Sequence, residues 1–145
     1  MDRKPLFDAF WRGDAEALTR HCSKILLQTI SYHDYHEDFY HAVLTGMFVA
    51  SGYAVSSNRE SGLGRSDIIV KDQRNMRAAV IEVKQAPDKA SLPRLASDAL
   101  KQIATMAYDA DLLEEYDTVL RWGLAFYKKR CLAQIGDIFT RSYSA

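Results

Sequence analysis

Residues 78–84 read AAVIEVK, and this stretch decides which fold the chain is expected to adopt. Side chains alternate between the two faces of a β-strand, so Glu82 and Lys84 project to one side while Ile81 and Val83 point into a core. A half-exposed strand that carries a solvated glutamate and lysine has the same pattern. Taken alone, these seven residues leave a structural and a functional interpretation open.

Residues 64–70 read GRSDIIV and place a second acid at the start of another buried strand. The polar connection 72–75 suits a hairpin between strands at 67–71 and 78–85. Such a hairpin brings the carboxylates of Asp67 and Glu82 side by side, where they repel each other unless a cation or a proton lies between them. The alternative is that Asp67 caps backbone N–H groups at the end of a loop.

Two carboxylates beside an amine suit chemistry on a phosphodiester. Oxygen ligands of this kind are preferred by Mg²⁺ and Mn²⁺, which keep several waters and leave room for a phosphate oxygen. Lys84 would stabilise the negative charge that develops during attack on phosphorus, or position the attacking water. We therefore expect Asp67, Glu82 and Lys84 to form a catalytic site in a cleft open to solvent.

The remaining periodicity predicts an α/β chain in which a helix, three strands, a helix and two strands follow a helical prefix. Asp14 is the expected N-cap of the second helix in the prefix, and Ser91 is the expected N-cap of the helix after the third strand. We expect the prefix over 1–33, helix 34–51, strands 53–57, 67–71 and 78–85, a helix from 91 to about 113, and strands 118–127 and 131–135.

Composition places the chain among ordinary globular domains. Its 145 residues fit one domain, and 48% hydrophobic with 26% charged residues excludes disordered and fibrous classes. No apolar run approaches the ~20 residues of a membrane helix, and the first residues do not form a secretory signal. We expect a cytoplasmic protein with no membrane partner, in which Cys22 and Cys131 are free thiols in preference to one disulfide.

The overall charge argues against tight, purely electrostatic binding of nucleic acid. Nineteen basic residues balance nineteen acidic ones, whereas such binding needs a strongly basic surface. A local basic rim, another domain or a homo-oligomer would have to supply the positive charge that binds the nucleic acid. The turn Lys128-Lys129-Arg130 is interpreted as a solvated hairpin tip, with contact to a substrate backbone as the alternative.

The order Asp67…Glu82-Val83-Lys84 resembles the D…(D/E)-x-K signature of the PD-(D/E)XK nuclease superfamily. A wider and more specific resemblance, to a prokaryotic branch whose nuclease-like domain usually follows an AAA-ATPase-like domain, lies in EDFYH at 37–41, SNRESGLGRSD at 57–67, IEVK at 81–84, ALKQI at 99–103 and GLAFY at 123–127. The resemblance implies a restriction-endonuclease-like core at 34–145, with a mixed central β-sheet flanked by helices. It also implies metal-dependent hydrolysis of nucleic acid, DNA before RNA, and an AAA-ATPase-like domain as partner.

Carried over residue by residue, the resemblance makes Asp67 and Glu82 ligands of Mg²⁺ or Mn²⁺ and Lys84 the catalytic lysine. It makes Glu37 a further metal ligand and Gln102 a polar residue that faces the site. Each of the last two has an alternative. Glu37 can pair with a capping Asp34 at a helix start, and Gln102 can be an ordinary exposed helix residue. Ser66 stands where the family pattern has proline.

Other polar residues near these motifs have weaker assignments. Arg59 and Arg65 flank the glycine-containing loop 61–64 and either contact phosphates or balance neighbouring acids. His33, His36 and His41 cluster in sequence, but their spacing does not match that of zinc hydrolases. The alternative to an enzyme is a nuclease-fold module that has lost its chemistry and binds nucleic acid or protein.

Overall fold

The computed structural model describes residues 2–29, 37–60, 65–106 and 108–141, and for residues 29, 37–38, 58–60, 65–66, 106 and 108–110 it describes the backbone alone. Its elements, in chain order, are α1 (Lys4–Arg12), α2 (Ala15–Thr29), α3 (Glu37–Ala50), β1 (Ala54–Glu60), β2 (Arg65–Asp72), β3 (Arg77–Gln85), the short 3₁₀ helix η1 (Lys89–Ser91), α4 (Leu92–Met106), α5 (Tyr108–Glu115), β4 (Thr118–Tyr127) and β5 (Arg130–Thr140).

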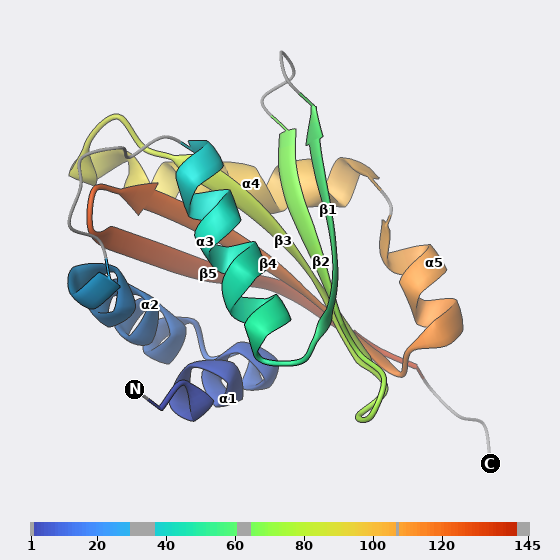
Figure 1. Cartoon of the computed structure of the whole chain (residues 1–145). Coiled ribbons are helices and arrows are strands. Elements are labelled where there is room, and N and C mark those ends of the chain that lie inside the picture. The colour runs from blue at the N-terminus through green and yellow to red at the C-terminus, as the bar shows by residue number, and fades with distance from the viewer. Residues whose placement is uncertain (1, 30–36, 61–64, 107, 142–145) are drawn as a thin grey trace.

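The strands form one five-stranded sheet in the order β1-β2-β3-β4-β5. β3 and β4 run parallel, and the other neighbouring pairs run antiparallel. α4 and α5 form the connection between the two parallel strands (Figure 1). The expected α/β architecture, a mixed sheet flanked by helices, is confirmed.

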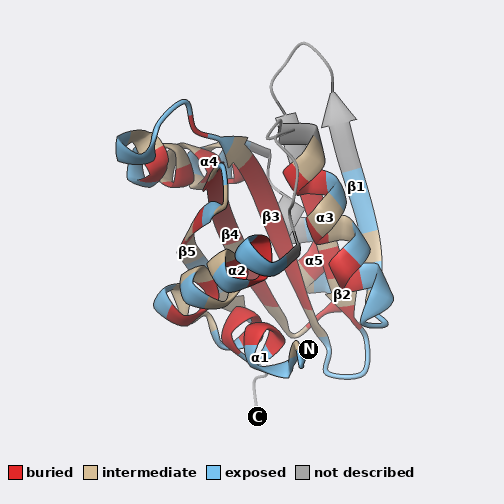
Figure 2. Cartoon of the chain, turned by 60° about the vertical axis from the view of Figure 1, so that its left-hand side comes forward, coloured by how far each residue is buried: buried red, intermediate tan, exposed pale blue. Residues whose placement is uncertain are grey.

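Helices cover both faces of this sheet. α1, α2 and α3 lie on one face, and α4 and α5 lie on the other (Figure 1). β3 and β4, in the middle of the sheet, are buried along nearly their whole length (Figure 2). Because each strand is covered on both sides, the central strands have long apolar runs rather than a strict apolar and polar alternation.

The two faces of β3 have separate cores. Ile81 and Val83 pack with residues of α1, α2 and α3, whereas Ala78 and Val80 pack with α4 and α5. On the first face the Trp122 indole stacks on the Phe10 ring at 5.8 Å and donates a hydrogen bond to the Phe10 carbonyl at 3.2 Å. Ile81 and Val83 therefore point into a core, as the sequence predicted, and Glu82 and Lys84 face the opposite side.

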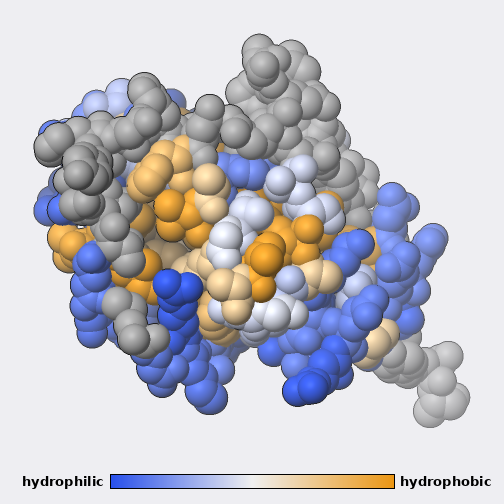
Figure 3. Space-filling view, viewed as in Figure 1, coloured by the Kyte–Doolittle hydropathy of each residue, from blue (hydrophilic) through white to orange (hydrophobic). Residues whose placement is uncertain are grey.

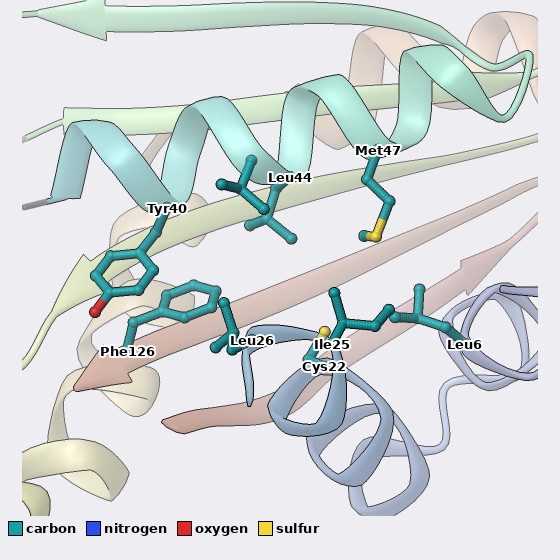
Figure 4. A pocket seen from close by; sticks show the side chains of 9 residues that line it. Leu6, Cys22, Ile25, Leu26, Tyr40, Leu44, Met47 and Phe126 are labelled. Atoms are coloured by element: carbon teal, nitrogen blue, oxygen red, sulfur yellow. The ribbon is translucent and has the colours of Figure 1, made fainter. Parts of the chain in front are cut away.

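A small apolar cavity lies between α2 and α3. Hydrophobic residues gather over α3 and in the space beside it, with hydrophilic residues around them (Figure 3). The cavity itself is lined by side chains such as Leu26, Leu44 and Met47 (Figure 4) and holds about 10 Å³ of free space. That volume is no larger than one water molecule, so the cavity is an irregularity of core packing rather than a ligand site.

α2 also protects one edge of the sheet. The Ser23 hydroxyl bonds both the N–H and the carbonyl of Cys131, each at 3.2 Å, and the Thr19 hydroxyl accepts from the Ala133 N–H at 2.9 Å. These hydrogen bonds satisfy backbone groups of β5 that could otherwise pair with a strand of another molecule. No described helix is long and apolar enough to cross a membrane.

Several boundaries follow from local chemistry. Asp14 caps α2 as expected, since its Oδ1 accepts from the Ala17 N–H at 3.0 Å. The prediction for Ser91 was wrong in detail, because its N–H and hydroxyl both donate to Asp88 Oδ1. The helix expected to run from 91 to about 113 is two helices, α4 and α5, with different directions (Figure 1). β5 continues five residues beyond the predicted end at Ile135.

Candidate functional site

The β2–β3 hairpin places two carboxylates directly opposite each other. Asp67 pairs with Glu82 in the strand register, so both side chains project from the sheet face that α4 covers. Side chains at directly opposite positions have Cβ atoms about 5 Å apart. Only 1% of the surface of either residue is exposed. The predicted hairpin is confirmed, but the carboxylates are buried rather than open to solvent.

Lys84 lies next to this pair and connects it to α4. Its Nζ is 3.9 Å from Glu82 Oε1 and donates a hydrogen bond to Gln102 Oε1. About 18% of the Lys84 side chain remains exposed, compared with 2% for Glu82. Gln102 therefore faces the site, which decides between the two interpretations of this residue.

A glycine allows α4 to lie this close. Gly123 is the β4 neighbour of Glu82, and a Cβ atom at position 123 would stand 2.3 Å from the Ala96 carbonyl oxygen of α4. No side chain fits in that space, so the α4 backbone rests directly on β4 beside Glu82. This contact sets the distance between α4 and the sheet and, six residues further along α4, the position of Gln102.

His41 of α3, which the sequence suggested only as a weak zinc-ligand candidate, is a neighbour of Asp67. Its Nε2 lies 3.4 Å from the Asp67 backbone carbonyl, and it is 4% exposed. Burial lowers the pKa of His41, and the nearby carbonyl and charge of Asp67 offset this only in part. The imidazole is therefore neutral at pH 7, and His41 supports the β2 backbone at the point where Asp67 projects.

Three predicted residues have backbones in the described elements but side chains outside the description. Glu37 begins α3, while Arg59 and Arg65 belong to β1 and β2 on either side of residues 61–64. His33 and His36 lie outside the described residues altogether. The roles predicted for Glu37, Arg59 and Arg65 therefore stay predictions.

The donor set of the described side chains fits a hard divalent cation. Among them no group of three or more histidine, cysteine, aspartate and glutamate residues is placed to hold a metal ion, so Asp67 and Glu82 stand as a pair. Mg²⁺ is commonly bound through one or two carboxylates, with waters and phosphate oxygens completing its shell. A pair of carboxylates opposite each other on a hairpin meets that requirement.

A comparison with protein families gives a match over most of the chain. A family model described as the PD-(D/E)XK nuclease superfamily matches residues 35–134. The matched region contains Asp67, Glu82, Lys84 and Gln102 and extends through most of the described elements from α3 into β5. Searches of curated proteins and of solved structures gave no match.

Proposed function

The chain belongs to the PD-(D/E)XK nuclease superfamily, and from this premise we propose that it hydrolyses phosphodiester bonds of nucleic acid, with DNA preferred to RNA. The observation that carries the proposal is the register of β2 and β3, which sets Asp67 opposite Glu82 on one face with Lys84 beside them. Lys84 supplies one positive charge beside two carboxylates, and like charges buried this close raise the free energy of the folded state unless a further cation compensates them. Such an arrangement suits a metal site better than a purely structural one.

In this proposal Asp67 and Glu82 hold Mg²⁺ or Mn²⁺, with Glu37 as a third ligand from the start of α3. When bound, the ion polarises the scissile phosphate and makes a coordinated water more acidic. Lys84 places its ammonium where negative charge develops on the phosphate oxygens, and the low dielectric of a buried site strengthens that interaction. Gln102 positions the ammonium by accepting one of its hydrogen bonds.

Other assignments accompany this chemistry. Arg59 and Arg65 would contact substrate phosphates, since the planar guanidinium matches phosphate geometry. Because the net charge is zero, an AAA-ATPase-like domain or a homo-oligomer would supply part of the grip on the substrate. Residues 1–33 would act as a helical prefix to a nuclease-like domain at 34–145. The buried free thiols Cys22 and Cys131 favour a cytoplasmic location.

The test is cleavage of linear, circular and branched DNA and of RNA in Mn²⁺ by the wild type and by Lys84→Ala. Lys101→Ala is the matched control, because Lys101 is an exposed lysine of α4 next to Gln102. We expect Lys84→Ala to lose turnover while it still binds Mn²⁺, and Lys101→Ala to stay within about twofold of the wild type, since surface substitutions rarely matter.

Two outcomes would change the assignment. Equal cleavage by the wild type and Lys84→Ala would contradict the proposed site and point to another active centre or to a contaminant. Mn²⁺ binding with no cleavage of any substrate would instead indicate a nuclease-fold binding module that has lost its chemistry.

A further inference from the structure

A basic groove lies at the end of the sheet toward which Lys84 is placed. It has a volume of about 650 Å³ and is formed by the β4–β5 turn, one side of α2 and the segment that leads into α4. These three parts lie side by side at the left of Figure 1. Its charged lining residues are Lys89, Lys128, Lys129 and Arg130, and none of the described residues that line it is acidic.

A second groove, at the β2–β3 turn, shows why this matters. That groove has a volume of about 480 Å³ and also contains cations, among them Lys71 and Arg74. This groove also includes a carboxylate, however. Asp72 forms an ion pair with Arg77, in which Arg77 Nε lies 2.8 Å from Asp72 Oδ2. The positive charge of the second groove is therefore partly compensated by the protein itself, whereas no described residue that lines the first groove carries a compensating negative charge.

The β4–β5 turn holds its cations on a fixed backbone. The Tyr40 hydroxyl of α3 donates to the Lys128 carbonyl at 2.6 Å, and the Tyr40 ring stacks on Phe126 at 4.5 Å. The turn is thus attached to the helix whose first residue is Glu37. A groove that is already ordered loses less conformational entropy when a ligand binds.

The floor of the groove provides apolar surface beside these charges. Tyr127 and Leu132 are half-buried in it, and Lys128 Nζ stands 5.4 Å from the centre of the Tyr127 ring. Proteins that hold single-stranded nucleic acid combine cations that follow the backbone with aromatic rings on which bases stack. A simple inorganic anion would use the cations but not this floor.

The strand register connects the groove to the proposed catalytic residues. Lys84 pairs with Ala125, which precedes Tyr127 by two residues. With strands about 4.8 Å apart and a rise of about 3.3 Å per residue, the Cα atoms of Lys84 and Tyr127 are roughly 8 Å apart. A strand with one phosphate at Lys84 would therefore reach the groove within a few nucleotides.

We propose that this groove binds the backbone of single-stranded nucleic acid adjacent to the scissile phosphate, with Lys129 and Arg130 on the phosphates and Tyr127 under a base. The proposal rests on the proposed nuclease function and adds the surface that grips the substrate. It also explains how a chain of zero net charge can bind a polyanion, since the basic residues are concentrated where the strand passes.

The experiment measures binding of a fluorescent 20-nucleotide oligothymidine to the full chain by anisotropy in EDTA, where no cleavage takes place. The groove variant is Lys129→Ala with Arg130→Ala. The matched control is Lys71→Ala with Arg74→Ala, which removes the same charge from the second groove. Thermal melting confirms that both variants fold.

We expect the groove variant to bind at least tenfold more weakly. Its slope of log affinity against log salt should fall by about 1.4, because each phosphate that a side chain neutralises contributes about 0.7 to the slope for a single strand. The control should stay within about twofold of the wild type.

Tyr127→Leu should weaken binding several-fold with an unchanged salt slope, because stacking involves no counterion. Equal affinities for the groove and control variants, a preference for duplex that does not depend on Tyr127, or no binding by the wild type would each overturn the proposal.

Binding and cleavage fail separately. Binding is measured in EDTA on groove variants that keep Lys84, and turnover is measured in Mn²⁺ on Lys84→Ala, so each readout concerns one set of residues. If groove variants bind normally while Lys84→Ala loses turnover, the proposed binding groove is wrong and the proposed nuclease function is supported. If groove variants lose binding while the wild type cleaves nothing in Mn²⁺, the binding groove is supported and the proposed nuclease function is wrong.

Discussion

The β2–β3 hairpin carries buried carboxylates at both of its ends, and the charged and polar groups around them differ between the two ends. Near the turn, Asp72 accepts a hydrogen bond from Arg77 at 2.8 Å and another from Asn75 at 2.9 Å. At the other end, Asp67 lies opposite Glu82, and the Lys84 ammonium is 3.9 Å from Glu82. The exposed fractions are small at both ends, at 8% for Asp72 and 1% for Asp67 and Glu82.

The comparison separates a structural acid from the acids that we propose to be functional on the same two strands. Asp72 takes its partners from within five residues, so the turn compensates its own charge. Asp67 and Glu82 bring two negative charges together in a buried place, an arrangement that folding alone does not favour. Sites that cost stability in this way are commonly maintained for binding or catalysis.

The largest expected effect concerns turnover. Asp67→Asn should reduce the rate of cleavage about a thousandfold, or about 4 kcal/mol, because a carboxylate that binds the metal becomes a neutral amide. Asp72→Asn, the same change at the other end of the hairpin, should leave the rate within a few-fold. Initial cleavage rates in saturating Mn²⁺ make the comparison. Similar losses in both variants would mean that the two ends do not differ in function.

For stability, we expect the larger loss at the other end of the hairpin, at Asp72. Asp72→Ala should lower the free energy of unfolding by about 1–2 kcal/mol, because it leaves the half-buried Arg77 guanidinium without its ion pair. We place the value below that of a fully buried pair because 30% of the Arg77 side chain is exposed. Urea denaturation at pH 7 measures the effect. A change under about 0.3 kcal/mol would show that this pair is an ordinary surface ion pair.

Removal of one charge from the facing carboxylates should raise stability instead. Asp67→Asn keeps the shape of the side chain, ends its repulsion with Glu82 and leaves the Lys84–Glu82 ion pair in place, so in EDTA the free energy of unfolding should increase by about 1 kcal/mol. The same urea titration measures this change. If the variant is less stable than the wild type without metal, the Asp67 carboxylate contributes to folding in its own right.

The smallest effect is a dependence on pH. Burial raises the pKa of Asp72, but the hydrogen bonds from Asn75 and Arg77 outweigh it, and the net pKa lies below its ordinary value of 3.8. A lowered pKa means that the folded state favours the carboxylate. The contribution of Asp72 is therefore complete above the unfolded pKa and is lost as the pH falls through the folded one. Urea denaturation should give a stability gap between the wild type and Asp72→Asn that is wider at pH 6 than at pH 3; a gap independent of pH would contradict this origin.

The sequence predicts the local parts of this account and misses those that depend on packing between distant elements. Asp67 and Glu82 belong to one hairpin, so alternation and a polar turn are enough to bring them together. The contact of Gln102 with Lys84 depends on the close approach of α4 to Gly123, and the family resemblance rather than periodicity was the signal that Gln102 faces the site. The burial of Asp67 and Glu82 also depends on packing between distant elements and was not predicted.

The basic turn shows the same limit. Residues 128–130 form a largely exposed turn, as interpreted from the sequence, and the alternative of contact to a substrate backbone stayed open because a sequence shows charges but not their surroundings. The groove arises only when α2 and the segment before α4 pack beside the turn. His41 likewise contacts Asp67 across 26 residues, a distance over which periodicity carries no information. Contacts between elements, rather than the elements themselves, are what the sequence leaves undetermined.

The most direct measurement is Mn²⁺ binding by isothermal titration calorimetry to the wild type, Asp67→Asn and Asp72→Asn. We predict that the wild type and Asp72→Asn bind one Mn²⁺ with similar affinity and that Asp67→Asn binds it at least about tenfold more weakly, a difference of about 1.4 kcal/mol. Equal affinity of the wild type and Asp67→Asn for Mn²⁺, or no binding by the wild type, would contradict the claim that the facing carboxylates form a metal site.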